Sequence, residues 1–434
     1  MGGVYVSSRS EGDAVIAYAR LAGVGLILGM VAAGCGQAAT GGSSGSVSPS
    51  LSVEVSRAPS TSEHGGVLAD GLNEAGFGLF RQAAGDTSAD VVISPLSIGL
   101  AFGMADVGAT GATAEALREL FGYPVDGEDR WSAFNTLDRD VTDVGGPVVR
   151  VANRQYPDVS FATAPDYDQT LRRWFGTGIE PLALRSEPEQ SRARINEWVA
   201  EQTEQLIPEL VPEGMVNSQS VMLLVNALYL AADWERPFGK YPTQDAPFTR
   251  LDGSEVTVPL MHELELAGPA VVTDAYAATE VPYEGGELSM LVIVPEQGHY
   301  EQVQDALSNE LIAQIDADAT AGPVELWLPR FESDSRLDLR KAFDALGVKD
   351  VFGGSGSWDG IAAGIYLESG VHAADISVDE HGTVAAAATA LGFEESGAAT
   401  PDVTVRADKP FLYLIRHQPT GAVLFVGRVT DPSA

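Results

Sequence analysis

Residues 382–393 form a run without charge or proline in which alanine and threonine predominate. Read with a period of two, alternate residues from Thr383 to Phe393 share one face of a possible strand, and each of them is compatible with burial. The other face carries Val384 and three alanines, as a strand inside a sheet covered on both sides requires. Gly382 gives the backbone unusual freedom just before the run. The run therefore predicts a segment that is able to become a buried central strand.

Composition alone leaves a second interpretation of this run open. Alanine has the highest helix propensity, and a pattern with no distinct apolar face fits an ordinary alanine-rich helix equally well. The surrounding motifs decide in favour of the strand.

The segment from Asp379 to Thr389 resembles the hinge of the serpins, in which Glu-x-Gly-Thr-x-Ala-Ala-Ala-Ala-Thr precedes an exposed reactive loop. The resemblance covers roughly residues 66–432 and rests on several motifs in the family's order. These motifs are Val92-Ile93-Ser94-Pro95-Leu96-Ser97, Gly108-Ala109-Thr110-Gly111, Ile195-Asn196-x-Trp198-Val199, Asn226-Ala227-Leu228-Tyr229, Trp234-Glu235-Arg236-Pro237-Phe238, Val281-Pro282-Tyr283, Leu328-Pro329-Arg330-Phe331, Ala407-Asp408-Lys409-Pro410-Phe411 and Gly427-Arg428-Val429.

The resemblance implies an α+β serpin fold with three β-sheets, about eight or nine helices and an exposed reactive loop. A chain of 434 residues would ordinarily divide into two or three domains. No internal linker supports such a division, so we expect a single domain over residues 67–434. Its first helix is predicted over residues 67–84, followed by a strand at 91–93 and a helix that Ser94 caps.

The N-terminal part predicts export from the cytoplasm. An apolar run of about 13 residues follows Arg20 and fits the core of a secretory signal better than a membrane span, which needs about 20. Ala32-Ala33-Gly34-Cys35 resembles a bacterial lipobox, although Ala32 stands where leucine is usual. We expect a signal peptide at residues 1–34, lipidation of Cys35, and a flexible tether at 35–66. A signal anchor, or cleavage without lipidation, remains the alternative.

Charge and cysteine content limit the partners. The formal charge of −35 and the absence of a basic cluster argue against nucleic acid or heparin as a partner. The stretch 128–140, where some serpins carry a heparin-binding helix, is acidic on balance. Cys35 is the only cysteine, so no disulfide forms within the chain. We expect a monomer that meets a membrane only through its lipid anchor, on the outer face of the cell membrane.

Catalytic and metal-binding patterns are weak. The six histidines form no His-x-x-x-His pair, and Glu296 with His299 lies in a predicted turn. Glu394 and Glu395 are neighbours in sequence and not the facing pair of an acid–base catalyst. No Gly-x-Ser-x-Gly motif is present around Ser355. The sequence predicts neither an enzyme nor a cofactor, and a hydrolase is the weakest of the hypotheses.

The resemblance implies roles for two sets of residues. One governs how the main sheet opens: Ser94, Ser97, Asn226, Trp234 and His372. The other is the hinge that enters the sheet: Glu380, Gly382, Thr383, Ala385, Ala386, Ala387, Ala388 and Thr389.

The implied activity is suicide inhibition of a serine or cysteine protease. The protease cleaves the loop, and the freed hinge inserts into the sheet before the acyl-enzyme is hydrolysed. Counting forward from Glu380 places Ser396 before the scissile bond, and counting back from Pro410 places Ala399 there, so the loop is about three residues longer than usual. The candidates for the residue before the scissile bond are Glu395, Ser396, Gly397, Ala398 and Ala399.

The small candidates favour elastase-like or subtilisin-like targets, whereas cleavage after Glu395 would suit a glutamate-specific protease. A non-inhibitory serpin that acts as a surface binding protein is the main alternative, and the extra loop length is its one hint.

Overall fold

The computed structural model describes residues 56–61, 64–85, 88–123, 126–205, 207–353, 357–367, 370–383, 401 and 403–433. Side chains of 265–267 are not described. Cys35, residues 384–400 and therefore all candidates for the scissile bond lie outside this part of the chain. No helix within it is long and apolar enough to cross a bilayer.

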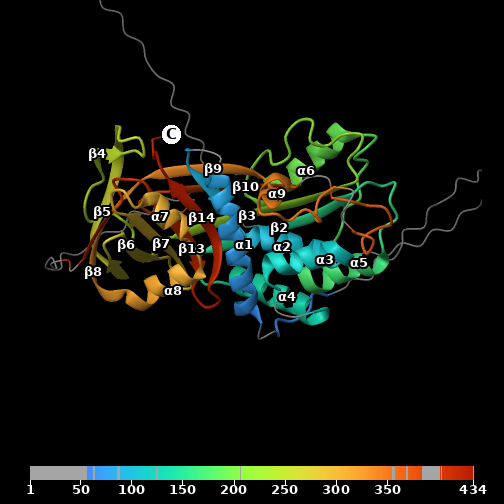
Figure 1. The fold of residues 1–434 in the computed structure, drawn as a ribbon, viewed down its shortest axis with the longest axis horizontal. Helices are drawn as coiled ribbons and strands as arrows, with labels where there is room; N and C mark the ends of the chain where they lie inside the picture. The colour runs from blue at the N-terminus through green and yellow to red at the C-terminus, as the bar shows by residue number, and fades with distance from the viewer. Residues whose placement is uncertain are drawn as a thin grey trace, which may run out of the picture. The chain divides into compact units, whose positions relative to one another are not determined.

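Nine helices lie in the described residues (Figure 1). The expected first helix is confirmed as α1, and the Ser94 hydroxyl caps α2 by accepting a hydrogen bond from the Ser97 amide at 3.1 Å. The helices are α1 (Gly65–Gly85), α2 (Pro95–Asp106), α3 (Gly111–Phe121), α4 (Glu128–Thr142), α5 (Pro165–Phe175), α6 (Pro188–Gln202), α7 (Tyr300–Asp305), α8 (Asn309–Asp318) and α9 (Leu339–Ala345).

The larger sheet has nine strands, ordered β1-β14-β13-β7-β6-β5-β8-β12 with β4 paired to β5. The 18-residue strand β5 pairs in turn with β4, β8 and β6 along its length. It therefore joins two of the expected three sheets into one network. The strands are β1 (Val91–Ile93), β4 (Gln244–Thr249), β5 (Glu255–Val272), β6 (Tyr276–Pro282), β7 (Leu288–Pro295), β8 (Thr320–Pro329), β12 (Val403–Arg406), β13 (Phe411–His417) and β14 (Ala422–Val429).

The smaller sheet has five strands in the order β2-β3-β11-β10-β9. These strands are β2 (Val148–Pro157), β3 (Met222–Asp233), β9 (Phe331–Asp338), β10 (Val371–Val378) and β11 (Gly382–Thr383). Because β11 is antiparallel to both neighbours, β3 and β10 run parallel to each other.

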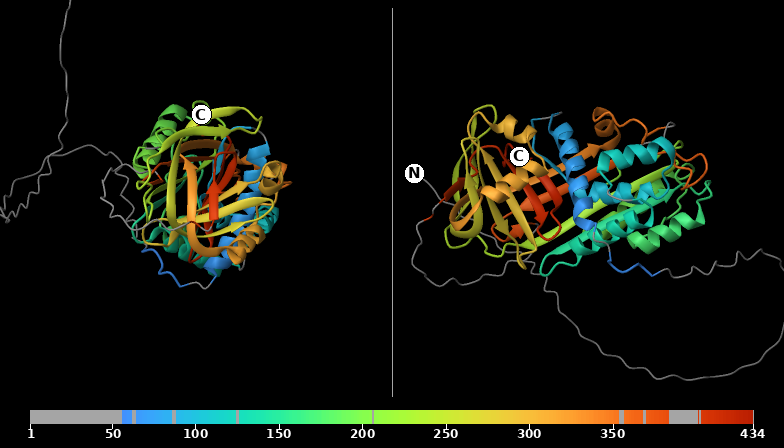
Figure 2. Two further views of the ribbon diagram at one scale, coloured as in Figure 1. Left: turned by 90° about the vertical axis from the view of Figure 1, so that its left-hand side faces the viewer. Right: turned by 60° about the horizontal axis from the view of Figure 1, so that its bottom comes forward.

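Helices cover both faces of the five-stranded sheet (Figure 1). Leu228 and Ile376 share the main core with α2, whereas Ala227 and Ala373 share a second core with residues of α6. Neighbouring residues of one strand thus enter different cores, as the pleat of a β-strand requires. The cyan to green helices that follow β1 gather along the long strands of this sheet (Figure 2).

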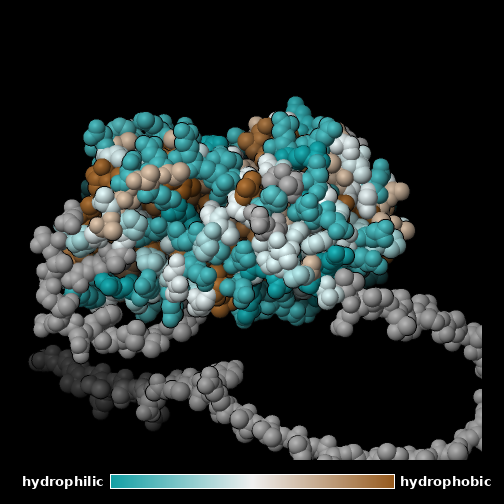
Figure 3. Space-filling model, turned by 90° about the horizontal axis from the view of Figure 1, so that it is seen from below, coloured by the Kyte–Doolittle hydropathy of each residue, from teal (hydrophilic) through white to brown (hydrophobic). Residues whose placement is uncertain are grey.

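The surface agrees with the acidic composition. The face drawn in Figure 3 is mostly hydrophilic, and its apolar atoms form small, separate patches. The helices and sheets described above confirm the expected α+β fold.

Candidate functional site

The first two residues of the alanine-rich run are already part of the five-stranded sheet. In β11, Gly382 pairs with Asp233 and Thr383 pairs with Ala232 on β3, while Thr383 also pairs with Val378 on β10. Beyond these residues no ladder joins β3 directly to β10 within the described chain. The hinge therefore enters between β3 and β10 at one end only, and further along the two strands lie next to each other without a ladder.

The side chain of Thr383 points into the protein and is fully buried. Its hydroxyl lies 2.5 Å from the Tyr283 hydroxyl, and the Tyr283 ring stacks on Trp234 with centroids 4.5 Å apart. The Trp234 indole donates a hydrogen bond of 2.9 Å to the carbonyl of Asp379. The stacked aromatic pair therefore holds both ends of the turn that leads into β11.

A charged contact fixes the same turn from outside. Arg330 donates to both carboxylate oxygens of Glu380 at 2.6 to 2.9 Å, and the Thr243 hydroxyl donates to the same carboxylate. Partial burial acts to raise the pKa of Glu380, but these hydrogen bonds outweigh it and hold the pKa below its usual value. Glu380 is thus ionised and paired at neutral pH.

The backbone of β3 lies so close to position 382 that only glycine fits there. A Cβ at this position would lie 2.0 Å from the carbonyl oxygen of Ala232 and 2.8 Å from the Cα of Asp233. Both atoms belong to the backbone of β3, so the clash cannot be relieved by rotating a side chain. Any larger residue at position 382 has to push the hinge away from β3.

Polar residues from three strands and the start of one helix meet in the middle of the sheet. On α2, the Ser97 hydroxyl donates to Asn226 on β3, and the Asn226 amide donates back to the Ser97 carbonyl at 2.8 Å. The Asn226 amide also donates to the Asn153 side chain on β2. On β10, His372 accepts a hydrogen bond of 2.9 Å from the Ser94 amide through Nε2. This cluster joins β2, β3 and β10 to the start of one helix.

His372 is neutral, and one of its ring nitrogens has no hydrogen-bond partner in the part of the chain that the structure describes. Its burial is complete and lowers its pKa to about 3. Nδ1 is buried and has no hydrogen-bond partner within the described chain. A buried nitrogen without a hydrogen-bond partner is unusual in a native protein, so its presence indicates that a further partner belongs beside it.

Comparison with known proteins decides the family. A family model described as Serpin (serine protease inhibitor) matches residues 70–432. The leukocyte elastase inhibitor of Equus caballus is 32% identical over 367 residues, which is 82% of this chain and 96% of the relative. The chain belongs to the serpin family. The human leukocyte elastase inhibitor is also 32% identical, over 355 residues that span 79% of this chain and 93% of the relative.

Solved structures agree with this assignment to the serpins. Uncleaved ovalbumin aligns with a TM-score of 0.77 at 27% identity and covers 84% of this chain and 100% of its own. Serpin48 of Tenebrio molitor aligns with a TM-score of 0.76 at 25% identity and covers 84% of this chain and 98% of its own.

The predicted site residues of this serpin fall into two groups in space. Glu380, Gly382, Thr383 and Trp234 meet at one end of the sheet, and Ser94, Ser97, Asn226 and His372 meet at its middle. Hinge residues 385–389 lie outside the described chain, so their roles stay predictions.

The sequence interpretation missed Tyr283, Arg330 and Asn153 as parts of the site. Tyr283 and Arg330 stand in the motifs Val281-Pro282-Tyr283 and Leu328-Pro329-Arg330-Phe331. The hydroxyl of the first and the positive charge of the second could have marked them as polar partners of the hinge. Asn153 carried no such signal, because only the register of β2 against β3 places it opposite Asn226.

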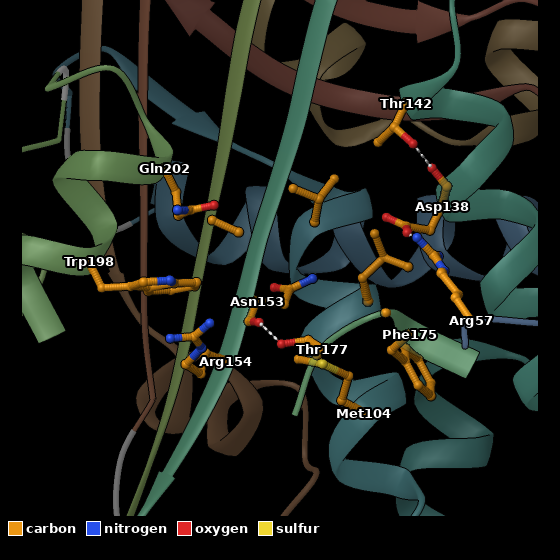
Figure 4. A pocket seen from close by; sticks show the side chains of 14 residues that line it. Arg57, Met104, Asp138, Thr142, Asn153, Arg154, Phe175, Thr177, Trp198 and Gln202 are labelled. Carbon is orange, nitrogen blue, oxygen red and sulfur yellow. Dashed lines mark hydrogen bonds and ion pairs between the residues drawn. The ribbon is translucent and has the colours of Figure 1, made fainter. Parts of the chain in front are cut away.

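A cavity of about 250 Å³ borders the edge strand β2 of this serpin's five-stranded sheet (Figure 4). Its charged side chains are already paired: Arg57 binds Asn135 and Asp138, and Arg154 binds Glu180. It presents no nucleophile with an adjacent base. In the described residues no three His, Cys, Asp or Glu side chains are placed to hold a metal ion.

Replacing Gly382 by Val tests the close fit of the hinge against β3. The new side chain would overlap the β3 backbone, so we expect β11 to leave the sheet and the Thr383 amide to exchange hydrogen faster, as measured by hydrogen–deuterium exchange. His381→Ala is the matched control, because the His381 side chain is 43% exposed and its ladder-flanking carbonyl is kept. Unchanged exchange in Gly382→Val would contradict the steric argument.

The depressed pKa of His372 predicts a pH dependence of stability. In the unfolded chain this group titrates near 6.5, so as the pH falls from about 6.5 to 3 only the unfolded chain binds the proton. The free energy of unfolding should then fall by up to about 1.4 kcal/mol per pH unit from this group.

Denaturant unfolding from pH 7 to pH 4 measures this effect in wild type and in His372→Gln. The glutamine carbonyl is able to accept from the Ser94 amide but does not titrate, so we expect a shallower pH dependence in the variant. Equal slopes would show that His372 is not the group responsible.

Proposed function

We propose that this serpin is a suicide-substrate inhibitor of serine proteases that traps the acyl-enzyme by inserting its cleaved loop into the five-stranded sheet. The observation that carries the proposal is β11, because the hinge already occupies the first two residues of a central strand. Serpin loop insertion is an established case of strand addition to a sheet.

The registers of β11 support insertion of the whole hinge. If the pairings of Thr383 with Ala232 and Val378 are continued by one residue at a time, Thr389 comes between Asn226 and His372. Alternation puts Thr389 on the same buried face as Thr383. Its hydroxyl would then meet the polar cluster at the middle of the sheet, where His372 Nδ1 has no partner within the described chain.

The composition of the hinge fits this path. The inward positions after Thr383 carry alanine, threonine, leucine and phenylalanine, none of which would bury a charge. Absence of proline keeps every ladder donor available. A serpin with bulky or charged inward residues would lack such a path.

Energetics make the trap feasible. An inserted strand of about a dozen residues would form ladder bonds on both sides, each worth roughly 0.5 to 1.5 kcal/mol net, which gives on the order of 10 kcal/mol. No ladder between β3 and β10 within the described chain has to be broken first. Since loss of one oxyanion-hole donor slows acyl chemistry by about a hundredfold or more, distorting a tethered protease should slow deacylation by at least a similar factor.

The relatives support an elastase-like target. The names of the horse and human relatives identify them as leukocyte elastase inhibitors. Candidates Ser396, Ala398 and Ala399 suit small specificity pockets of the elastase or subtilisin kind. A cysteine protease target and the binding-protein alternative have no comparable support.

We further propose that the inhibitor is exported and held on the outer face of the cell membrane by a lipid on Cys35. The lipobox-like sequence before Cys35 and the Gly/Ser/Thr-rich stretch after it support this proposal. The tether would let the domain reach proteases away from the lipid surface.

Replacement of Thr383 by Arg tests the trapping mechanism. Burying an unpaired charge on the inward face costs several kcal/mol, so insertion should stall and the loop should be cut as an ordinary substrate. We expect the covalent adduct with elastase or subtilisin, seen by denaturing electrophoresis, to fall by about tenfold or more while the cleaved form accumulates.

Val384→Arg is the matched control. In the continued register its outward neighbours, Ser377 and Ala231, are only half-buried, so an arginine there is able to reach solvent. Wild type and Val384→Arg should both form the adduct. Adduct formation by Thr383→Arg at the wild-type rate would refute the insertion mechanism, and no adduct with wild type would refute inhibition of these proteases.

A further inference from the structure

A segment that follows α6 lies across the strand position into which the hinge would insert. This covering segment, residues 207–216, contributes Ile207, Leu210, Val211 and Val216 to the second core. The same core contains Ala227 of β3 and Ala373 of β10. The covering segment therefore packs over strands that lie on both sides of the position.

On the β3 side the covering segment is tied firmly to α6. The side-chain oxygen Oδ1 of Asn196 accepts from the backbone amides of Leu210 and Val211 at 3.1 and 2.8 Å, and its side-chain Nδ2 donates to the Val211 carbonyl at 2.9 Å. Arg192 of α6 donates to the Glu209 carboxylate at 2.9 Å. Helix α6 itself packs on β2, so these bonds fix the segment to that half of the sheet.

On the other side Arg336 holds the covering segment to β9. Its guanidinium donates a hydrogen bond of 3.0 Å to the carbonyl of Glu209. In the ladder Arg336 pairs with Ala373, and the continued register of β11 would bring Ala388 beside Ala373 and Ala227. This contact thus spans the insertion path at the height of Ala388.

Insertion has to move these two anchors apart. A strand between β3 and β10 requires a separation of about 9.5 Å, twice the ordinary strand spacing, whereas Cα atoms of the two strands now approach within 8 Å. Arg336 would travel with β10 and β9, while the covering segment would stay with α6. The Arg336–Glu209 bond belongs to the arrangement before insertion and must be released as the strand enters.

We propose that Arg336 is a positioning residue that clasps the covering segment across the insertion path and slows entry of the loop. This role rests on the proposed function, because it concerns the same insertion step. Removing the hydrogen bond between Arg336 and Glu209 should speed insertion of the cleaved loop, and it should equally speed insertion of a separate peptide.

The test is the rate at which the intact, full-length protein takes up a synthetic peptide with the sequence of residues 383–393, followed by native electrophoresis. One such hydrogen bond predicts about a two- to tenfold faster uptake by Arg336→Ala. Arg336→Lys keeps a donor and should return the rate toward that of wild type.

Arg150→Ala is the matched control. Arg150 on β2 pairs with Glu204 just after α6, so its contact also joins a strand to this region but stays on one side of the path. Its uptake rate should equal that of wild type. Wild-type uptake by Arg336→Ala, or equal acceleration by Arg150→Ala, would overturn the clasp and leave the proposed function intact. If wild type takes up no peptide and forms no protease adduct, the proposed function falls, and the role of Arg336 falls with it.

Discussion

The contact on which the rest of this structure depends is the burial of Thr383 between β3 and β10. Its hydroxyl meets Tyr283, whose ring stacks on Trp234, and that indole binds the carbonyl of Asp379. Arg330 holds Glu380 just outside. These contacts commit the first residues of the hinge to the sheet and fix the register in which any further residue has to follow.

The consequences of that register run through the whole five-stranded sheet. If the hinge inserted in this register, Thr389 would face the polar cluster of Asn226 and His372, and outward alanines would face the second core beneath residues 207–216. A His372 nitrogen without a partner among the described residues, and small residues at Ala227 and Ala373, are the features expected of a sheet that is built to take one more strand. The covering segment and Arg336 then govern how readily that strand enters.

Much of this arrangement was predictable from the sequence, for identifiable reasons. The cap of α2 at Ser94 and the buried strand at 91–93 follow from local propensity, and the motifs located Trp234, Asn226 and His372. Contacts between distant strands were not predictable in this way. Asn153 joins the site only through the pairing of β2 with β3, and Arg336 reaches Glu209 only because the segment after α6 crosses the sheet.

The central claim is that the intact chain is held in an arrangement less stable than the one it would reach with its hinge inserted. The most direct measurement is thermal unfolding of the intact protein and of protein cleaved once between residues 395 and 400. Insertion worth on the order of 10 kcal/mol should raise the melting temperature of the cleaved protein by about 20 °C or more. A cleaved protein that melts at or below the temperature of the intact one would contradict the account.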